Sequence, residues 1–277
     1  MAHDTSTDTP QDAEATAEPL AVVTGASSGI GLELAKQFAM HGFDVAIVAE
    51  DEGINAAART LMGFGTTVTP IQVDLAKADG VDLFYRRLRA LGRLADAVAI
   101  NAGVGVGGPF IETSLDEELN LIALNVTSTV RLAKRIIPDM VQRGYGRVLF
   151  TSSIAAETPG PFEAVYAASK AFILSFAEAL RNELRDTGVS VTALQPGATD
   201  TNFFHRAHMA DTKVATSEKD SPADVARDGF AALMAGKDHV VAGSWKNVLQ
   251  STIAQITPET MKAEQHRKMA EPGSANP

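Results

Sequence analysis

The sequence predicts an α/β fold, a doubly wound parallel sheet of about seven strands with helices on both faces. Two observations indicate this class. Short apolar runs alternate along the chain with segments in which apolar residues recur every three or four positions, the pattern of strands alternating with amphipathic helices. The stretches rich in glycine and hydroxyl groups also follow strand runs directly, as expected when a site lies at the C-terminal edge of a parallel sheet.

Composition and charge limit the classes of protein that fit. With 277 residues, 45% hydrophobic and 21% charged, the chain predicts one large domain over residues 19–270. A net charge of -10 argues against a nucleic-acid partner. No apolar run or leader pattern predicts a membrane span or a signal peptide, so a cytoplasmic protein is expected. The absence of cysteine excludes disulfides, cysteine metal sites and a thiol nucleophile.

The two ends of the chain are expected to be irregular. Residues 1–18 carry five acidic side chains and no Lys or Arg among Ala, Thr, Ser and Pro, which predicts a disordered acidic tail. Binding of a partner by this tail is the alternative. Residues 271–277 are predicted to be frayed.

The first predicted strand, 20–24, leads through a glycine turn into a helix whose apolar face carries Ile30, Leu34 and Phe38. Strand, glycine turn and helix in this order form a site for a phosphate, because the start of the helix presents free N–H groups. The spacing is G-x-x-x-G-x-G, and an ordinary glycine turn is the alternative. The candidate cofactor residues of this turn are Gly25, Ser27, Ser28, Gly29, Ile30 and Gly31.

The second predicted strand, 45–48, ends just before Glu50, about 20 residues after the glycines. A carboxylate in this place can bind the ribose hydroxyls of NAD and would repel the 2′-phosphate of NADP, so NAD is the preferred cofactor. The alternative is that the acidic residues only begin the next helix, 53–64. After a third strand, 67–73, Asp74 could approach an adenine or close a turn, and a helix is expected over 81–91.

Two further strands end at candidate site residues. The fourth, 95–100, runs into Asn101, Ala102 and Gly103, small residues that suit a cleft for a flat cofactor and suit a tight turn equally. The fifth, 147–150, is followed by Ser153. The long helix after Ser114 carries Asn125 beside its apolar stripe, where an amide is more often structural than catalytic.

The segment 166–184 is predicted to be an amphipathic helix, with Tyr166 and Lys170 one turn apart on one face. An ammonium roughly 4 Å from a phenol favours the phenolate and lowers its pKa, which would make Tyr166 a usable general acid or base. Two such residues also fit an ordinary solvated helix face.

A sixth strand, 189–194, leads to Pro196, Gly197, Thr199 and Thr201. The polar segment 200–221 is interpreted as a lid over the substrate. His205 and His208 within it are expected to be surface residues, and no metal site is predicted. A helix over 222–234 and a last strand over 239–242 complete the pattern. Apolar residues that either line a pocket mouth or pack the core are Pro159, Phe162, Phe203, Phe204 and Met209.

The ordered motifs resemble those of the short-chain dehydrogenase/reductase family, over residues 19–243. They are T-G-A-S-S-G-I-G at 24–31, N-A-G at 101–103, Asn125, Ser153 and Y-x-x-x-K at 166–170. The resemblance implies a Rossmann fold. It also implies that Tyr166 exchanges a proton with the substrate oxygen and that Ser153 positions that oxygen. Lys170 would lower the tyrosine pKa and bind the nicotinamide ribose, and Asn125 would hold a water in a proton relay.

The resemblance also implies a cofactor-binding set. Beyond the glycine turn, Tyr166 and Lys170, the candidates are Glu50, Asp74, Leu75, Asn101, Ala102, Gly103, Pro196, Gly197, Thr199 and Thr201. NAD-preferring members place aspartate where this chain has Ala49, and NADP-preferring members place arginine where it has Glu50. The family pairs its long fourth and fifth helices, so a homodimer or homotetramer is expected, with Phe172 and Phe176 facing either a partner or the core.

The function expected from the resemblance is hydride transfer between a nicotinamide cofactor and a secondary alcohol or ketone, an apolar small molecule. A sugar-nucleotide epimerase or dehydratase would need a larger C-terminal domain than the roughly 80 residues after the sixth strand. A redox-sensing regulator that binds the dinucleotide without turnover is disfavoured because all four catalytic positions are filled.

Overall fold

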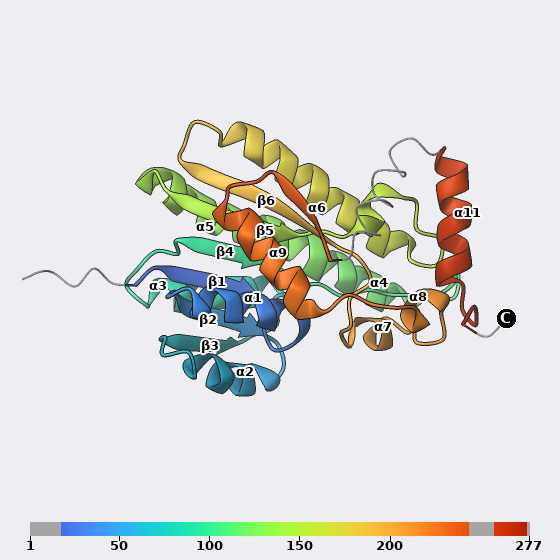
Figure 1. The fold of residues 1–277 in the computed structure, drawn as a ribbon, viewed down its shortest axis with the longest axis horizontal. Helices are drawn as coiled ribbons and strands as arrows, with labels where there is room; N and C mark the ends of the chain where they lie inside the picture. Colours follow the sequence, from blue (N-terminus) through green and yellow to red (C-terminus); the bar gives the residue numbers. More distant parts are fainter. Residues whose placement is uncertain (1–17, 244–257, 276–277) are drawn as a thin grey trace, which may run out of the picture.

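The computed structural model describes residues 18–243 and 258–275, so the predicted acidic tail lies almost entirely outside the described residues. Seven parallel strands form one sheet (Figure 1). Their bounds are β1 Leu20–Thr24, β2 Asp44–Ala49, β3 Val68–Gln72, β4 Ala97–Ile100, β5 Gly146–Thr151, β6 Val189–Pro196 and β7 His239–Ala242. The predicted fold class is confirmed.

The strand order is β3-β2-β1-β4-β5-β6-β7. The chain starts at the centre of the sheet, moves outward to β3, and returns to β4 on the other side of β1. The order of the strands thus reverses between β1 and β4, because β1 to β3 form one half of the sheet and β4 to β7 form the other. In sheets of this kind, ligands bind in the crevice at the C-terminal ends of the two strands where the order reverses. Register pairs such as Val22 with Val98 align the two strands.

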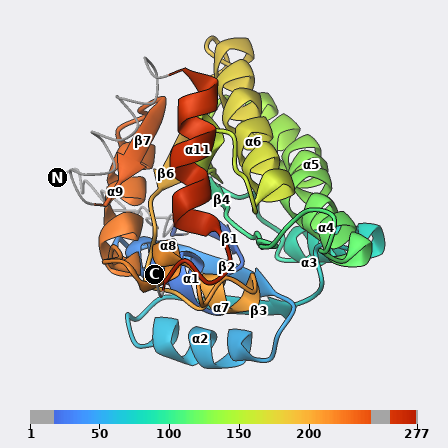
Figure 2. The same ribbon diagram turned by 90° about the vertical axis from the view of Figure 1, so that its right-hand side faces the viewer.

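The helices form two layers and a cap (Figure 2). Their bounds are α1 Gly29–Met40, α2 Gly53–Met62, α3 Ala78–Arg89, α4 Leu115–Ile122, α5 Thr129–Arg143, α6 Ala164–Glu183, α7 Phe203–Arg206, α8 Lys213–Thr216, α9 Pro222–Met234 and α11 Glu259–Ala270. A π-helix, η1 Ala123–Ser128, joins α4 to α5, and a 3-10 turn, η2 Ile154–Glu157, precedes α6.

Each face of the sheet has its own apolar core. On one face, α1, α2 and α9 bury residues such as Phe38 and Phe230, whose rings meet edge to face at 5.2 Å. On the other, α3, α5 and α6 bury residues such as Phe84 and Ile173. Because the five inner strands are covered on both faces, most of them read as apolar runs rather than as alternating ones, whereas the edge strands β3 and β7 are only partly buried.

The structure differs from the sequence expectations mainly after β6. The sixth strand is longer than predicted and includes Pro196. The expected fraying from residue 271 does not hold for residues 271–275, because Gly273 N donates to Asp211 Oδ2 at 2.8 Å and Lys213 N donates to Ser274 Oγ at 2.9 Å. Helix α11, for which the sequence offered no apolar pattern, lies across the C-terminal edge of the sheet (Figure 2).

Candidate active site

The glycine turn after β1 is held tightly against the sheet. Gly25 N donates to Val48 O at 2.8 Å, and Gly25 and Gly29 have φ angles of +67° and +57°. A Cβ on Gly31 would lie 2.1 Å from Gly25 O. Helix α1 starts here without a side-chain cap, so its first N–H groups face the crevice and suit a diphosphate.

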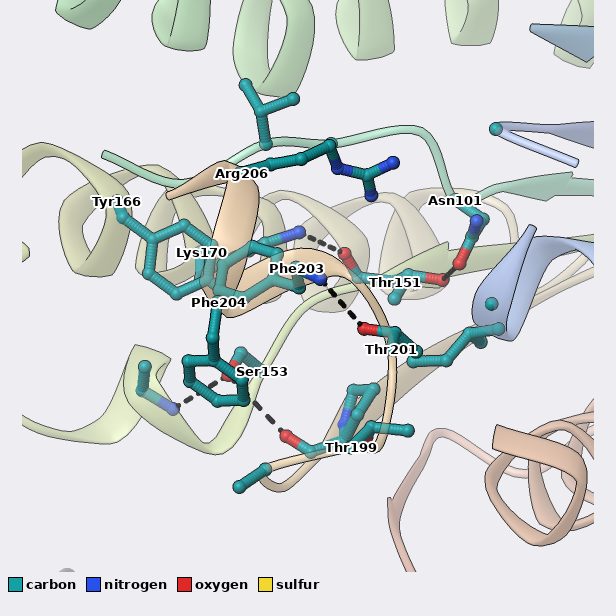
Figure 3. Close-up of a pocket in the computed structure, with 18 of the residues that line it drawn as sticks. Asn101, Thr151, Ser153, Tyr166, Lys170, Thr199, Thr201, Phe203, Phe204 and Arg206 are labelled. Carbon is teal, nitrogen blue, oxygen red and sulfur yellow. Dashed lines mark hydrogen bonds between the residues drawn. The ribbon is translucent and has the colours of Figure 1, made fainter. Parts of the chain in front are cut away.

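Hydrogen bonds between strand ends fix the floor of this crevice. Thr24 Oγ1 accepts from the backbone N of Asn101 and of Ala102, both at 2.9 Å. The Thr151 hydroxyl in turn donates to Asn101 Oδ1 at 3.0 Å, as Figure 3 shows. The ends of β1, β4 and β5 are therefore joined side by side, as the predicted convergence of the motifs requires.

Carboxylates surround the far end of the crevice. Asp51 Oδ2 accepts from the Ser27 hydroxyl at 2.7 Å, which ties the end of β2 to the glycine turn. Glu50 beside it is exposed. The Asp74 carboxylate accepts a hydrogen bond from Ala76 N at 2.9 Å and so closes a turn. Asp74 also lines the cavity. These carboxylates make this end of the cavity acidic.

Ser153, Tyr166 and Lys170 converge at the other end, and all three are buried. Lys170 Nζ lies 5.7 Å from the centre of the Tyr166 ring and donates to Thr151 O at 3.0 Å (Figure 3). Ser153 Oγ accepts from Ala155 N at 3.1 Å, and its hydroxyl faces Pro196 O at 3.5 Å. The three groups come from the segment just after β5 and from one face of α6, which is the juxtaposition expected from the sequence.

The expected lowering of the Tyr166 pKa is wrong for this structure. Burial raises the pKa of the Tyr166 phenol, the negative charge of Glu163 raises it further, and only the Ser153 hydroxyl acts in the opposite direction. Burial also lowers the pKa of Lys170 to about 8. The physical reason is desolvation, which the spacing of the two residues in the sequence does not reveal.

Asn125 lies behind the crevice rather than on its wall. It sits in the π-helix η1 and is 2% exposed. Its Oδ1 accepts from Val104 N, and its Nδ2 donates to Val104 O, each at 2.9 Å, and to Ser169 Oγ at 3.0 Å. The amide therefore links α6 to the loop after β4, which agrees with a structural contribution.

A cavity of about 1100 Å³ runs from the acidic end to Tyr166. Apart from Asn125, every predicted cofactor or catalytic residue lines it. These are Gly25, Ser27, Ser28, Gly29, Ile30, Gly31, Glu50, Asp74, Leu75, Asn101, Ala102, Gly103, Ser153, Tyr166, Lys170, Pro196, Gly197, Thr199 and Thr201. A nicotinamide dinucleotide fits this set, because a glycine cradle, a helix start and a carboxylate end follow one another along one trough.

The segment 200–221 covers the Tyr166 end of the cavity. The Phe203 ring lies 5.2 Å from the Tyr166 ring and contacts the loop after β4, where a Cβ on Gly105 would lie 2.5 Å from it. Phe203 and Phe204 line the cavity, as Figure 3 shows. Met209 is 1% exposed and packs inside this segment instead.

Several cavity residues escaped the sequence reasoning. Glu163 and Arg206 line it, and so do five residues of α11 at helical spacing, Lys262, Gln265, His266, Met269 and Ala270. A search for apolar residues at helical spacing does not find the α11 residues, because most of them are polar. Their spacing of three and four positions can nevertheless be read from the sequence. His208 contacts Glu117 at 3.2 Å, and no cluster of three potential metal ligands occurs in residues 18–243 and 258–275.

No helix in the described parts of the chain is long and apolar enough to span a membrane.

Comparisons with known proteins agree with this geometry. The model of the family described as short chain dehydrogenase matches residues 19–211. The probable oxidoreductase EphD of Mycobacterium tuberculosis is 34% identical over 71% of this chain, but the match covers only 34% of EphD. The chain thus spans about a third of that relative. An uncharacterized oxidoreductase of Myxococcus xanthus is 36% identical over 69% of this chain and 78% of its own length.

Solved structures show the same fold. A short-chain dehydrogenase from Sphingobium yanoikuyae in complex with NADPH is 31% identical, with a TM-score of 0.75 over 80% of this chain and 87% of its own. A bulky-bulky ketone specific alcohol dehydrogenase from Comamonas testosteroni is 26% identical, with a TM-score of 0.73 over 90% of this chain and 98% of its own.

Proposed function

Because the chain belongs to the short-chain dehydrogenase/reductase family, we propose that it is an NAD(P)-dependent oxidoreductase acting on secondary alcohols and ketones. One observation carries the proposal: Ser153, Tyr166 and Lys170 share a single cavity with a glycine turn suited to a diphosphate. When bound, the nicotinamide would supply or accept a hydride at C4. Absorbance of the reduced nicotinamide, followed with a panel of ketones and secondary alcohols, tests the activity.

Residues of this chain would transfer the proton that accompanies the hydride. In ketone reduction, Tyr166 would donate its hydroxyl proton to the carbonyl oxygen, and in alcohol oxidation it would take that proton back. Burial raises the pKa of Tyr166, so the phenol is in the protonated form that donates during ketone reduction. Ser153 would hold the same oxygen by a hydrogen bond, and Lys170 would bind the nicotinamide ribose.

The substrate proposed is an apolar small molecule. Phe203 and Phe204 give the cavity an aromatic wall opposite Tyr166, and these rings would pack against the substrate body. The name of the Comamonas testosteroni relative, specific for bulky-bulky ketones, agrees with a large apolar substrate. No nucleic-acid partner is proposed, and the cytoplasmic location stays a prediction.

NAD is the proposed preferred cofactor, although the Sphingobium yanoikuyae relative was solved with NADPH. The support is charge: Glu50 and Asp51 are exposed carboxylates at the adenosine end of the cavity and would repel a 2′-phosphate.

Replacing Glu50 with arginine should therefore shift the ratio of the NADP and NAD dissociation constants towards NADP by ~10-fold or more, since it removes a repulsive charge and adds a phosphate-binding one. Titration of the nicotinamide fluorescence measures both constants. Glu52→Arg is the matched control, because Glu52 is exposed but does not line the cavity. An equal shift in both variants would contradict the charge argument.

A homodimer formed through α4 and α6 is also proposed. Leu115, Leu119 and Ile122 follow one face of α4 and are 70%, 52% and 39% exposed, and Phe172 on the adjacent α6 is 40% exposed. Phe176 instead packs on Phe150, with ring centres 5.6 Å apart. Such an apolar face is typical of a subunit interface.

Leu119→Lys should convert the dimer or tetramer to monomer, because a charge would have to be buried in the interface. Light scattering after size exclusion measures the mass. Met62→Lys serves as control, since Met62 is 50% exposed on α2, a helix of the other face of the sheet. A wild-type protein that is monomeric at micromolar concentration would refute the proposed assembly.

A further inference from the structure

Helix α11 lies over the C-terminal edge of the sheet, near α6 and α8 (Figure 2), and one of its faces lines the cavity. The residues of α11 on the cavity wall are Lys262, Gln265, His266, Met269 and Ala270. Their spacing of three and four positions places them on one side of the helix. A single face of α11 thus looks towards the Tyr166 end of the site.

This face is unusual for a packed helix because most of it is polar. Helices that lie on a protein core turn an apolar stripe inward. The inner face of α11 carries lysine, glutamine and histidine instead, while the apolar Met261 on another side is 54% exposed. The polar side chains of this face need hydrogen-bond partners, which are protein groups for Lys262 and His266 and solvent or a ligand for the exposed Gln265.

Two hydrogen-bond contacts, between His266 and Glu163 and from Lys262 to the backbone oxygen of Glu157, hold α11 against the segment that leads into α6. His266 Nε2 lies 3.0 Å from Glu163 Oε2, and these side chains are 17% and 8% exposed. Lys262 Nζ donates to Glu259 Oε1 at 2.8 Å and to Glu157 O at 3.3 Å. Since Glu163 lies three residues before Tyr166, the helix is held in a defined place relative to the reacting group.

The end of α11 also holds the lid. Ala270 packs against Ala207 and Met209 of the lid in one apolar cluster. The following residues donate to Asp211, through Gly273 N to Oδ2 at 2.8 Å and Ala275 N to O at 3.1 Å. The lid segment 200–221 and α11 therefore contact each other, and both line the same cavity.

On the face of α11 that lines the cavity, Gln265 and Met269 are the two side chains that a ligand could contact. Lys262 and His266 already contact carboxylates, those of Glu259 and Glu163. Gln265 is an exposed residue that lines the cavity, and its amide has no hydrogen-bond partner within the described residues. Met269 offers a half-buried apolar surface one turn further along. We propose that Gln265 and Met269 select the substrate, a ketone or alcohol with an apolar body and an uncharged hydrogen-bonding group remote from the reacting carbon.

The proposal rests on the proposed oxidoreductase function and is tested by substrate selectivity. The probes are benzylacetone and its para-hydroxy analogue, which share a skeleton and differ by one hydroxyl. The measured quantity is the ratio of kcat/KM for the hydroxylated ketone to kcat/KM for the plain one. Gln265→Leu should lower this ratio about tenfold, the effect of losing one hydrogen bond. Met269→Ala should lower kcat/KM for both ketones about fivefold by removing apolar contact.

Matched controls lie on other sides of the same helix. Glu264→Leu and Met261→Ala change exposed residues that do not line the cavity, and both should leave the ratio and both kcat/KM values within twofold of wild type. The cofactor dissociation constant and the melting temperature, measured for all variants, should also stay at the wild-type values.

The outcomes separate the two proposals. If wild type reduces both ketones and Gln265→Leu leaves the ratio within twofold, the role of α11 is refuted while the oxidoreductase function stands. Equal changes in the control variants would refute it as well. If wild type binds the cofactor but reduces neither probe nor any ketone of the wider panel, both proposals fail.

Discussion

Replacing Tyr166 with phenylalanine should lower kcat by ~100–10,000-fold while leaving the cofactor dissociation constant within ~3-fold of wild type. The variant loses only the hydroxyl, which is the group placed to exchange a proton with the substrate oxygen. The ring stays, so its packing against Phe203 at 5.2 Å and its place beside Lys170 are retained. Steady-state kinetics and a fluorescence titration of the reduced cofactor measure the two quantities.

Tyr145→Phe is the matched control, since Tyr145 is 41% exposed at the start of β5, the end of the strand away from the cavity. It should keep wild-type kcat. A Tyr166→Phe variant that keeps more than a tenth of the wild-type rate would remove the proton-transfer role. A wild-type protein that binds the dinucleotide and turns over no alcohol or ketone would instead favour a redox-sensing regulator.

The fold was predictable because its signals are local and periodic. Each buried strand reads as a short apolar run, and the glycine turn follows β1 in the sequence just as it does in space. A parallel sheet then brings the ends of β1, β4 and β5 together without further information, which is why Asn101 and Thr151 meet beside the glycine turn and Ser153 lines the same cavity.

The electrostatics of the site were not predictable from spacing. Tyr166 and Lys170 do lie on one face of α6, but the ammonium turns to Thr151 O rather than to the phenol. Burial then dominates both groups, raising the pKa of Tyr166 and lowering that of Lys170 to about 8. Desolvation depends on what covers a residue, and the covering segments come from distant parts of the chain.

Helix α11 was missed for a related reason. Its inner face is polar and its outer face is charged, so apolar periodicity, the main sequence signal for a helix, is absent. Its place is fixed by long-range pairs such as His266 with Glu163, 103 residues apart in the sequence. The substrate wall of the site is thus a tertiary feature, whereas the proposed cofactor trough is largely a local one.

A single methyl group at Gly31 should disable the cofactor trough. The Cβ of Gly31→Ala would lie 2.1 Å from Gly25 O and 2.7 Å from Asn101 Nδ2. The first contact is with backbone in the tight turn, and the second disturbs the bond from Asn101 Nδ2 to Thr24 O. We expect the cofactor affinity to fall by ~100-fold or more, and the free energy of unfolding to fall by ~1–3 kcal/mol because of overpacking.

Isothermal titration with the dinucleotide and chemical denaturation measure these two losses. Gly63→Ala is the matched control, because Gly63 has a φ of -63° and an added Cβ would meet only Thr60 O at 3.2 Å. It should change both quantities little. The turn must open to accept the Gly31 methyl, and the free N–H groups of α1 would then no longer converge on one point. A Gly31→Ala protein that binds the dinucleotide within tenfold of wild type would therefore place the phosphate away from this turn.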